Sequence, residues 1–154
     1  MKIAVYGGSF NPPHVVHAMV ASWLLWTDLV DEVWMVPVYR HAFEGIHDKK
    51  LASYSDRVQW CEAMETDVDS RIKVSTIESQ LPTPSYSIDT LQALAKQFPE
   101  HEFRLCVGSD VIPDLPNWKF FRHLSVHQIK IRRAVAQSWP IYSFESLWYW
   151  IAVA

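Results

Sequence analysis

Two histidines, His14 and His17, follow two glycines, Gly7 and Gly8, within the stretch Gly-Gly-Ser-Phe-Asn-Pro-Pro-His-Val-Val-His. Histidines three residues apart at the start of a helix share one face, and their N–H groups can donate to phosphate oxygens. Glycine lets the backbone approach a ligand closely. The pattern therefore indicates a phosphate site in which two imidazoles stabilise charge on a transferred phosphoryl or nucleotidyl group.

Less specific interpretations of the same stretch stay open. The histidines could cap a helix and fill its edge, and the glycines could serve only a tight turn. No metal is expected, because no third ligand stands at a matching spacing. The stretch is neither a P-loop nor a dinucleotide-binding GxGxxG fingerprint.

The elements that must position these residues alternate between strand and helix. Apolar runs predict strands at residues 2–6, 33–38, 72–77 and 103–107, and periodic segments predict helices at 14–26, 55–66 and 87–98. Ser55 and Ser87 are expected to cap the second and third helices. The expected apolar positions are Val15, Met19, Ser22, Trp23 and Trp26 in the first helix and Ile88, Leu91, Leu94, Ala95 and Phe98 in the third.

This alternation predicts an α/β fold with an open parallel sheet and right-handed crossovers. Ligands bind beyond the carboxyl ends of the strands in such a sheet, which is where the first glycine loop and the Gly108-Ser109-Asp110 turn would lie. Residues 39–53 read as a loop. Helices are expected at residues 123–137 and 142–154, and the aromatic-rich stretch 139–150 is suited to cover a sheet edge or to join two copies.

Bulk properties narrow the class of protein. The 154 residues predict a single domain over 1–154, and the net charge of -3 gives no reason to expect a nucleic-acid partner. No apolar run is long enough to cross a bilayer, so no membrane partner is expected. No signal peptide is visible at the start, so a cytoplasmic location is expected. Cys61 and Cys106 are expected to be buried free thiols.

Several motifs occur in an order that resembles the HxGH nucleotidyltransferase superfamily, and more closely the bacterial nicotinate-nucleotide adenylyltransferases. They are, after the glycine–histidine stretch, His47-Asp-Lys-Lys50, Arg57, Pro84-Ser-Tyr-Ser-Ile-Asp-Thr-Leu91, Val107-Gly-Ser-Asp110 and Trp118. The resemblance covers about residues 1–119 and implies a Rossmann-like nucleotidyltransferase fold with a shortened C-terminal part.

The resemblance also implies roles. AMP would pass from ATP to nicotinate mononucleotide, with Mg²⁺ carried on the triphosphate. The catalytic set would be His14, His17, Lys49, Lys50 and Arg132. The ATP-binding set would be Gly7, Gly8, Ser9, Phe10, Asn11, Gly108, Ser109, Asp110 and Ile131, and the mononucleotide would contact Ser85, Tyr86, Ser87 and Trp118.

These residues also have structural interpretations. Lys49 and Lys50 could be an ordinary solvated pair, and Arg57 could form a surface or structural ion pair. Residues 85–87 could be only a capped helix start, and Trp118 could be a core residue.

The sequence departs from the family pattern at two places. Val16 stands where HxGH has glycine, and His127, Gln128 and Ile129 replace the Ser-Ser-Thr of the family's ISSTxIR signature, of which Ile131-Arg132 is retained. Two alternatives follow: an adenylyl- or cytidylyltransferase with another phosphorylated acceptor, such as phosphopantetheine, or a nucleotide-binding protein without turnover.

Overall fold

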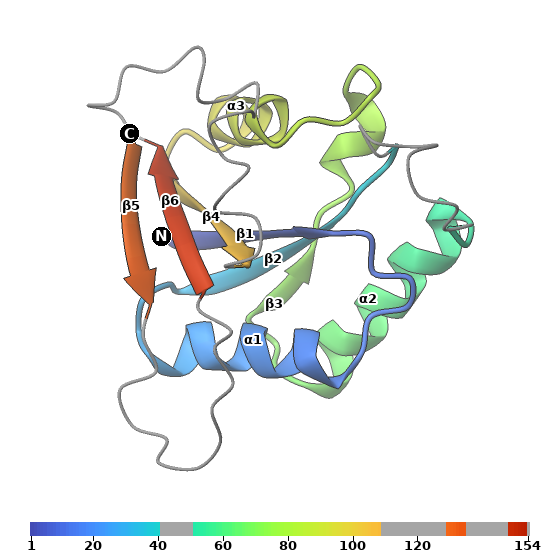
Figure 1. Cartoon of the computed structure of the whole chain (residues 1–154), viewed down its shortest axis with the longest axis horizontal. Coiled ribbons are helices and arrows are strands. Elements are labelled where there is room, and N and C mark those ends of the chain that lie inside the picture. Colours follow the sequence, from blue (N-terminus) through green and yellow to red (C-terminus); the bar gives the residue numbers. More distant parts are fainter. Residues whose placement is uncertain (41–50, 109–128, 135–147, 154) are drawn as a thin grey trace.

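The computed structural model describes residues 1–40, 51–108, 129–134 and 148–153 (Figure 1). Five of the expected site residues lie outside these ranges: Lys49, Lys50, Ser109, Asp110 and Trp118. Within the described ranges, no helix is long and apolar enough to span a bilayer.

Strands of one sheet form the centre of the fold, in the order β3-β2-β1-β4-β6-β5. Their bounds are β1 Lys2–Gly8, β2 Glu32–Pro37, β3 Ile72–Val74, β4 Glu102–Gly108, β5 Ile129–Ala134 and β6 Trp148–Val153. The first four strands are parallel, and β6 is antiparallel to β4 and to β5. The predicted open parallel sheet with flanking helices is confirmed for β1 to β4.

Helices cover both faces of this sheet (Figure 1). Helices α1 (Val15–Trp26) and α2 (Tyr54–Asp67) enclose one apolar cluster, which contains Cys61 and Cys106. Helix α3 (Ser87–Gln97) and the 3-10 turn η1 (Ile77–Gln80) enclose the other cluster. Both cysteines are free and buried, as expected, and burial raises the pKa of each thiol to about 12.

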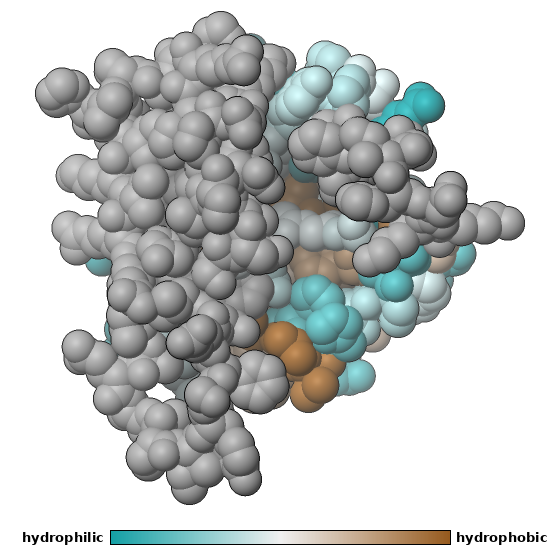
Figure 2. All heavy atoms as spheres, in the orientation of Figure 1, coloured by the Kyte–Doolittle hydropathy of each residue, from teal (hydrophilic) through white to brown (hydrophobic). Residues whose placement is uncertain are grey.

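Helix α1 buries a different stripe from the one that the spacing suggested. Its buried residues are Val20, Ala21, Leu24 and Leu25. Val15, Met19 and Trp26 are 70%, 50% and 73% exposed, and Figure 2 shows apolar surface over this helix. A helix that is apolar on most sides carries more than one stripe of this period, so spacing alone could not select the face that packs.

Several element ends also differ from expectation. Ser53, not Ser55, caps α2, because its hydroxyl accepts from the Asp56 N–H. Tyr86, not Ser87, is the N-cap of α3, and Ala95 of that helix is exposed. The third strand ends at Val74, and η1 begins where the apolar pattern predicted more strand.

The two C-terminal helices predicted from the sequence are wrong where the structure describes the chain. Residues 129–134 and 148–153 form strands β5 and β6. Alternating Ile-Lys-Ile-Arg has the two-residue period of a strand, and the second segment is rich in aromatic and β-branched residues. Strand β6 pairs along β4, so residues 148–150 take the expected role of covering a sheet edge.

Candidate functional site

The glycine–histidine stretch lies at the carboxyl ends of two neighbouring parallel strands. Strand β1 ends at Gly8 and β4 ends at Gly108, and Tyr6 is in register with Cys106. Helix α1 begins after this loop, so its N-terminus lies near the same edge; His14 and His17 form a capping box there, as one interpretation of the sequence held. Backbone N–H groups and the helix dipole together favour an anion there.

The two histidines form one unit at the start of α1. Their ring centroids are 3.9 Å apart. The backbone N–H of His14 donates to Nδ1 of His17 over 3.0 Å. Because Nδ1 is an acceptor, the ring proton of His17 lies on Nε2, where it can be donated to a ligand.

The surroundings of His17 favour this neutral form. Burial, reinforced by the neighbouring His14 imidazole, lowers the pKa of His17 from 6.5 to about 4. His17 is half-buried, whereas His14 is exposed. At neutral pH the pair therefore presents His17 as an uncharged hydrogen-bond donor rather than as a fixed positive charge.

Phe10 holds the loop against this pair. Its φ of 44° lies in the left-handed region, which a bulky side chain rarely adopts, so a local backbone cost must be offset by packing. The ring is 2% exposed and makes edge contacts with Tyr6 and His17, at centroid distances of 5.6 and 5.1 Å. Phe10 thus packs against the His17 imidazole and helps to hold it in place.

The two glycines differ in what they face. A Cβ atom on Gly7 would meet nothing within 4 Å, whereas one on Gly8 would lie 3.1 Å from the Phe10 ring. Gly8 is therefore required by the loop's own packing. Gly7 borders open space, which is the arrangement expected where a ligand approaches the backbone.

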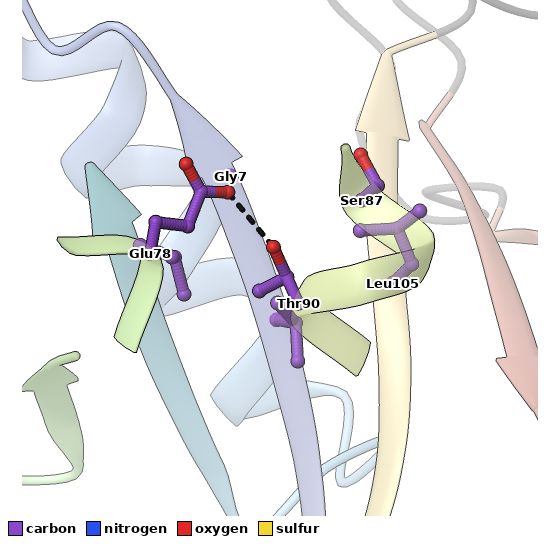
Figure 3. Close-up of a pocket in the computed structure, with 7 residues that line it drawn as sticks. Gly7, Glu78, Ser87, Thr90 and Leu105 are labelled. Carbon is purple, nitrogen blue, oxygen red and sulfur yellow. Dashed lines mark hydrogen bonds between the residues drawn. The ribbon is translucent and has the colours of Figure 1, made fainter. Parts of the chain in front are cut away.

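Gly7 also lines a cavity of about 20 Å³ between the strand ends and the start of α3 (Figure 3). The cavity is large enough for about one water molecule. Its polar lining comes from Gly7, Glu78, Ser87 and Thr90, and its apolar lining from Val5, Val36 and Leu105. Gly7 of the glycine–histidine loop and Ser87 of the expected mononucleotide side thus line the same cavity.

Ser85 and Arg40 join two segments on this side. The Ser85 N–H donates to the Arg40 carbonyl over 2.9 Å, and the Arg40 N–H donates to Ser85 Oγ over 3.3 Å. Tyr86 caps α3 through its carbonyl, which accepts from the N–H groups of Asp89 and Thr90. Residues 85–87 therefore form an ordered helix start at the edge of the site.

Arg57 is buried and binds backbone, unlike the surface residue considered from the sequence. It is 2% exposed and donates to three carbonyls, those of Ser9, Val38 and Ala52, at 2.8, 2.9 and 3.2 Å. Its guanidinium carbon lies 5.5 Å from the centre of the Tyr54 ring. Arg57 therefore ties the phosphate loop to the exit of β2 and to the residues before α2.

Sequence reasoning missed Glu78. This carboxylate is 7% exposed, accepts from Thr90 Oγ1 over 2.9 Å and from the Tyr39 N–H over 3.0 Å, and borders the cavity. Glu78 lies in η1, beyond the end of β3 at Val74, but the expected strand ran through Ile77 and so already placed Glu78 directly after a strand end. An acidic residue directly after a strand is the signal that could have found it.

Arg132 and Ile131 lie away from the histidines in the sheet. Both are in β5, where Arg132 is in register with Trp150, which is in register with Cys106 of β4. Three strand spacings of about 4.8 Å separate β5 from β1. Among the residues whose structure is described, no three His, Cys, Asp or Glu side chains are grouped so as to hold a metal ion.

Relatives and solved structures resemble this chain over most of its length. A protein of Myxococcus xanthus named "Probable nicotinate-nucleotide adenylyltransferase" is 36% identical over 80% of the chain, and one of the same name from Anaeromyxobacter sp. (strain K) is 39% identical over 76%. The chain spans 63% and 62% of their lengths.

Among solved structures, the nicotinic acid mononucleotide adenylyltransferase of Plasmodium falciparum, complexed with NaAD, is 25% identical, with a TM-score of 0.65. The alignment covers 77% of this chain and 57% of that one. The model of one family, described as cytidylyltransferase-like, matches residues 5–147, a range that includes the glycine–histidine loop, both covered faces of the sheet and the start of α3. The chain therefore belongs to the cytidylyltransferase-like family.

Proposed function

We propose that this chain is an adenylyltransferase that moves AMP from ATP to nicotinate mononucleotide and releases pyrophosphate. The observation that carries the proposal is the His14–His17 pair beside the Gly7–Gly8 backbone at the start of α1. Relatives that bear the corresponding name, and a solved relative holding NaAD, support the choice of acceptor.

In the proposed reaction, a phosphate oxygen of the mononucleotide attacks the α-phosphorus of ATP. The bond from that phosphorus to the bridging oxygen of the β-phosphate breaks, and pyrophosphate leaves with the bonding electrons. Catalysis consists mainly of positioning and charge stabilisation, so no covalent enzyme intermediate is needed. Nε2 of His17 would donate to the triphosphate, and the N–H groups at the start of α1 would add to the electropositive site.

The remaining roles are carried over from the family resemblance. Lys49 or Lys50 would neutralise the triphosphate, Ser109 and Asp110 would line the adenosine side, and Trp118 would contact the pyridine ring. ATP would enter as its Mg²⁺ complex, which needs no protein cage for the ion. We place the reaction in the cytoplasm and infer that the aromatic C-terminal stretch could join two copies of the chain.

Two alternatives are distinguishable. A different phosphorylated acceptor, such as phosphopantetheine, is favoured by no described contact but is tested by an acceptor screen. A nucleotide-binding protein without turnover is favoured by Val16 and by the replaced residues at 127–129. The latter predicts ATP binding without pyrophosphate release, and recovery when glycine at 16 and Ser-Ser-Thr at 127–129 are restored together.

The decisive experiment measures pyrophosphate release from ATP and Mg²⁺ with and without nicotinate mononucleotide. Wild type should release pyrophosphate only with the mononucleotide, and His17→Ala should lose most of this activity while still folding. Binding of ATP without release, with every acceptor in the screen, would contradict the proposal and favour the binding protein.

A further inference from the structure

Glu78 is a buried carboxylate with no role in the proposed chemistry. A charged group that leaves water needs hydrogen-bond partners, and Glu78 has one for each carboxylate oxygen. Oε2 accepts from the Tyr39 N–H, just beyond the end of β2, and Oε1 accepts from the Thr90 hydroxyl in the first turn of α3 (Figure 3). Glu78 thus joins two segments that border the site.

Residues 38–40 connect this carboxylate to two parts of the site, the glycine–histidine loop and the segment before α3. The Val38 N–H donates to the Gly8 carbonyl over 2.9 Å, and the Arg40 N–H donates to Ser85 Oγ. Three successive N–H groups therefore bind the phosphate loop, Glu78 and the segment before α3. Of these three acceptors, only Glu78 is charged.

Arg57 holds the glycine–histidine loop by hydrogen bonds of its own, although the Glu78 carboxylate also interacts with its guanidinium electrostatically. Its guanidinium binds the carbonyls of Ser9 and Val38, so the loop and the exit of β2 stay joined without the carboxylate. On the other side, the first turn of α3 is held to residue 39 through Thr90 and Glu78. Loss of Glu78 should therefore free the first turn of α3 from residue 39 and leave the Ser85–Arg40 bonds as the remaining connection on that side.

We propose that Glu78 is a positioning residue for the acceptor half of the site, acting through Tyr39 and Thr90 on residues 85–87. The assignment rests on the proposed function, because it takes residues 85–87 as the mononucleotide side. In this assignment the carboxylate acts on the site through its two hydrogen-bond partners. It sets the distance between the start of α3 and the end of β1, where the attacking phosphate must meet the α-phosphorus.

The test separates the KM for the mononucleotide from the KM for ATP. Glu78→Ala should raise the former about tenfold or more and lower kcat, while the KM for ATP changes by less than about threefold. Thr90→Val keeps the side-chain shape but removes the hydroxyl. It should also raise the KM for the mononucleotide, by a smaller factor than Glu78→Ala.

Glu78→Gln should stay close to wild type. Its amide oxygen can accept from the Tyr39 N–H, and its NH₂ group can donate to Thr90 Oγ1, whose proton then turns to the Tyr86 carbonyl 3.3 Å away. Wild-type kinetics of Glu78→Gln would show that the hydrogen bonds to Tyr39 and Thr90 position the acceptor side, and that the negative charge of residue 78 is not needed.

Ile77→Ala is the matched control, because Ile77 is in the same turn, is equally 7% exposed and packs only in the apolar cluster. It should lower the unfolding midpoint without a selective rise in the KM for the mononucleotide. If Glu78→Ala and Thr90→Val behave like this control, Glu78 has only a structural role and the assignment is overturned. Failure of the proposed function differs from this, because wild type itself would then neither bind the mononucleotide nor release pyrophosphate.

Discussion

The backbone N–H of His14 donates to Nδ1 of His17 over 3.0 Å, and this bond determines which nitrogen of His17 carries the proton. The N–H donor repels a second proton on Nδ1, and burial disfavours the charged ring, so both effects favour the neutral form. A neutral donor binds a phosphate oxygen without requiring a proton at each turnover.

The lowered pKa of His17 makes the free energy of unfolding depend on pH between about 4 and 6.5. The pKa is about 4 in the folded chain and near 6.5 when unfolded, so between these values only the unfolded chain binds the proton. The free energy of unfolding should therefore fall as pH falls from about 6.5 to about 4, with no His17 contribution to the slope outside this window.

Chemical denaturation of wild type and His17→Gln at several pH values measures this contribution as the difference between the two curves. Parallel curves between pH 6.5 and 4 would contradict the assignment. Nitrogen-15 chemical shifts of the His17 ring should show protonated Nε2 and unprotonated Nδ1 at pH 7, which checks the tautomer directly.

Gly7→Ala should impair substrate binding, whereas Gly8→Ala should impair the stability of the fold. The new methyl group at position 7 enters open space, so Gly7→Ala should keep the unfolding midpoint and raise the KM for substrate. At position 8 the methyl group meets the Phe10 ring 3.1 Å away, so Gly8→Ala should be destabilised by about 1–3 kcal/mol. Thermal unfolding combined with pyrophosphate release separates the two effects. Full activity of Gly7→Ala would mean that no substrate approaches this position.

Arg57 should be essential for stability as well as for the phosphate loop. Arg57→Ala leaves the carbonyls of Ser9, Val38 and Ala52 without this donor and should lower the free energy of unfolding by about 3 kcal/mol. Arg57→Lys should recover only part of this, because one ammonium group cannot donate in all three directions.

Denaturant titration measures this loss, and Arg71→Ala is the control. Arg71 is exposed and pairs with Asp69 at the surface, so its removal should have little effect. Equal stability of Arg57→Ala and Arg71→Ala would show that the buried guanidinium contributes nothing specific.

Val16→Gly tests whether the branched side chain crowds the histidine pair. Val16 is 49% exposed between the two histidines, so the substitution should raise kcat/KM for ATP at a cost of about 0.5 kcal/mol in helix stability. Val15→Gly, at an exposed neighbouring position, carries a similar backbone cost and should leave the kinetics unchanged. Identical kinetics for the two variants would show that Val16 does not restrict the site.

Local pattern was enough to predict the parallel part of the fold and the position of the glycine–histidine loop between β1 and α1. The apolar runs, glycines and prolines identified β1, β2 and β4 because each of these signals acts within a few residues. The same locality explains the errors. The two C-terminal segments are strands where the sequence predicts helices, although residues 129–134 alternate and residues 148–153 are rich in aromatic and β-branched side chains. The first helix buries a stripe that its spacing could not distinguish.

The sequence by itself determined that a glycine loop and two histidines follow a buried strand at the edge where ligands bind, because side-chain chemistry and chain order carry that information. Only the tertiary structure decided that Arg57 and Glu78 are buried and bind neighbouring backbone groups, the Val38 carbonyl and the Tyr39 N–H. Arg57 reaches Ser9 across 48 positions of the chain, and Glu78 reaches Tyr39 across 39. Bonds between such distant segments exist only after the sheet has brought the strand ends together, so no local spacing records them.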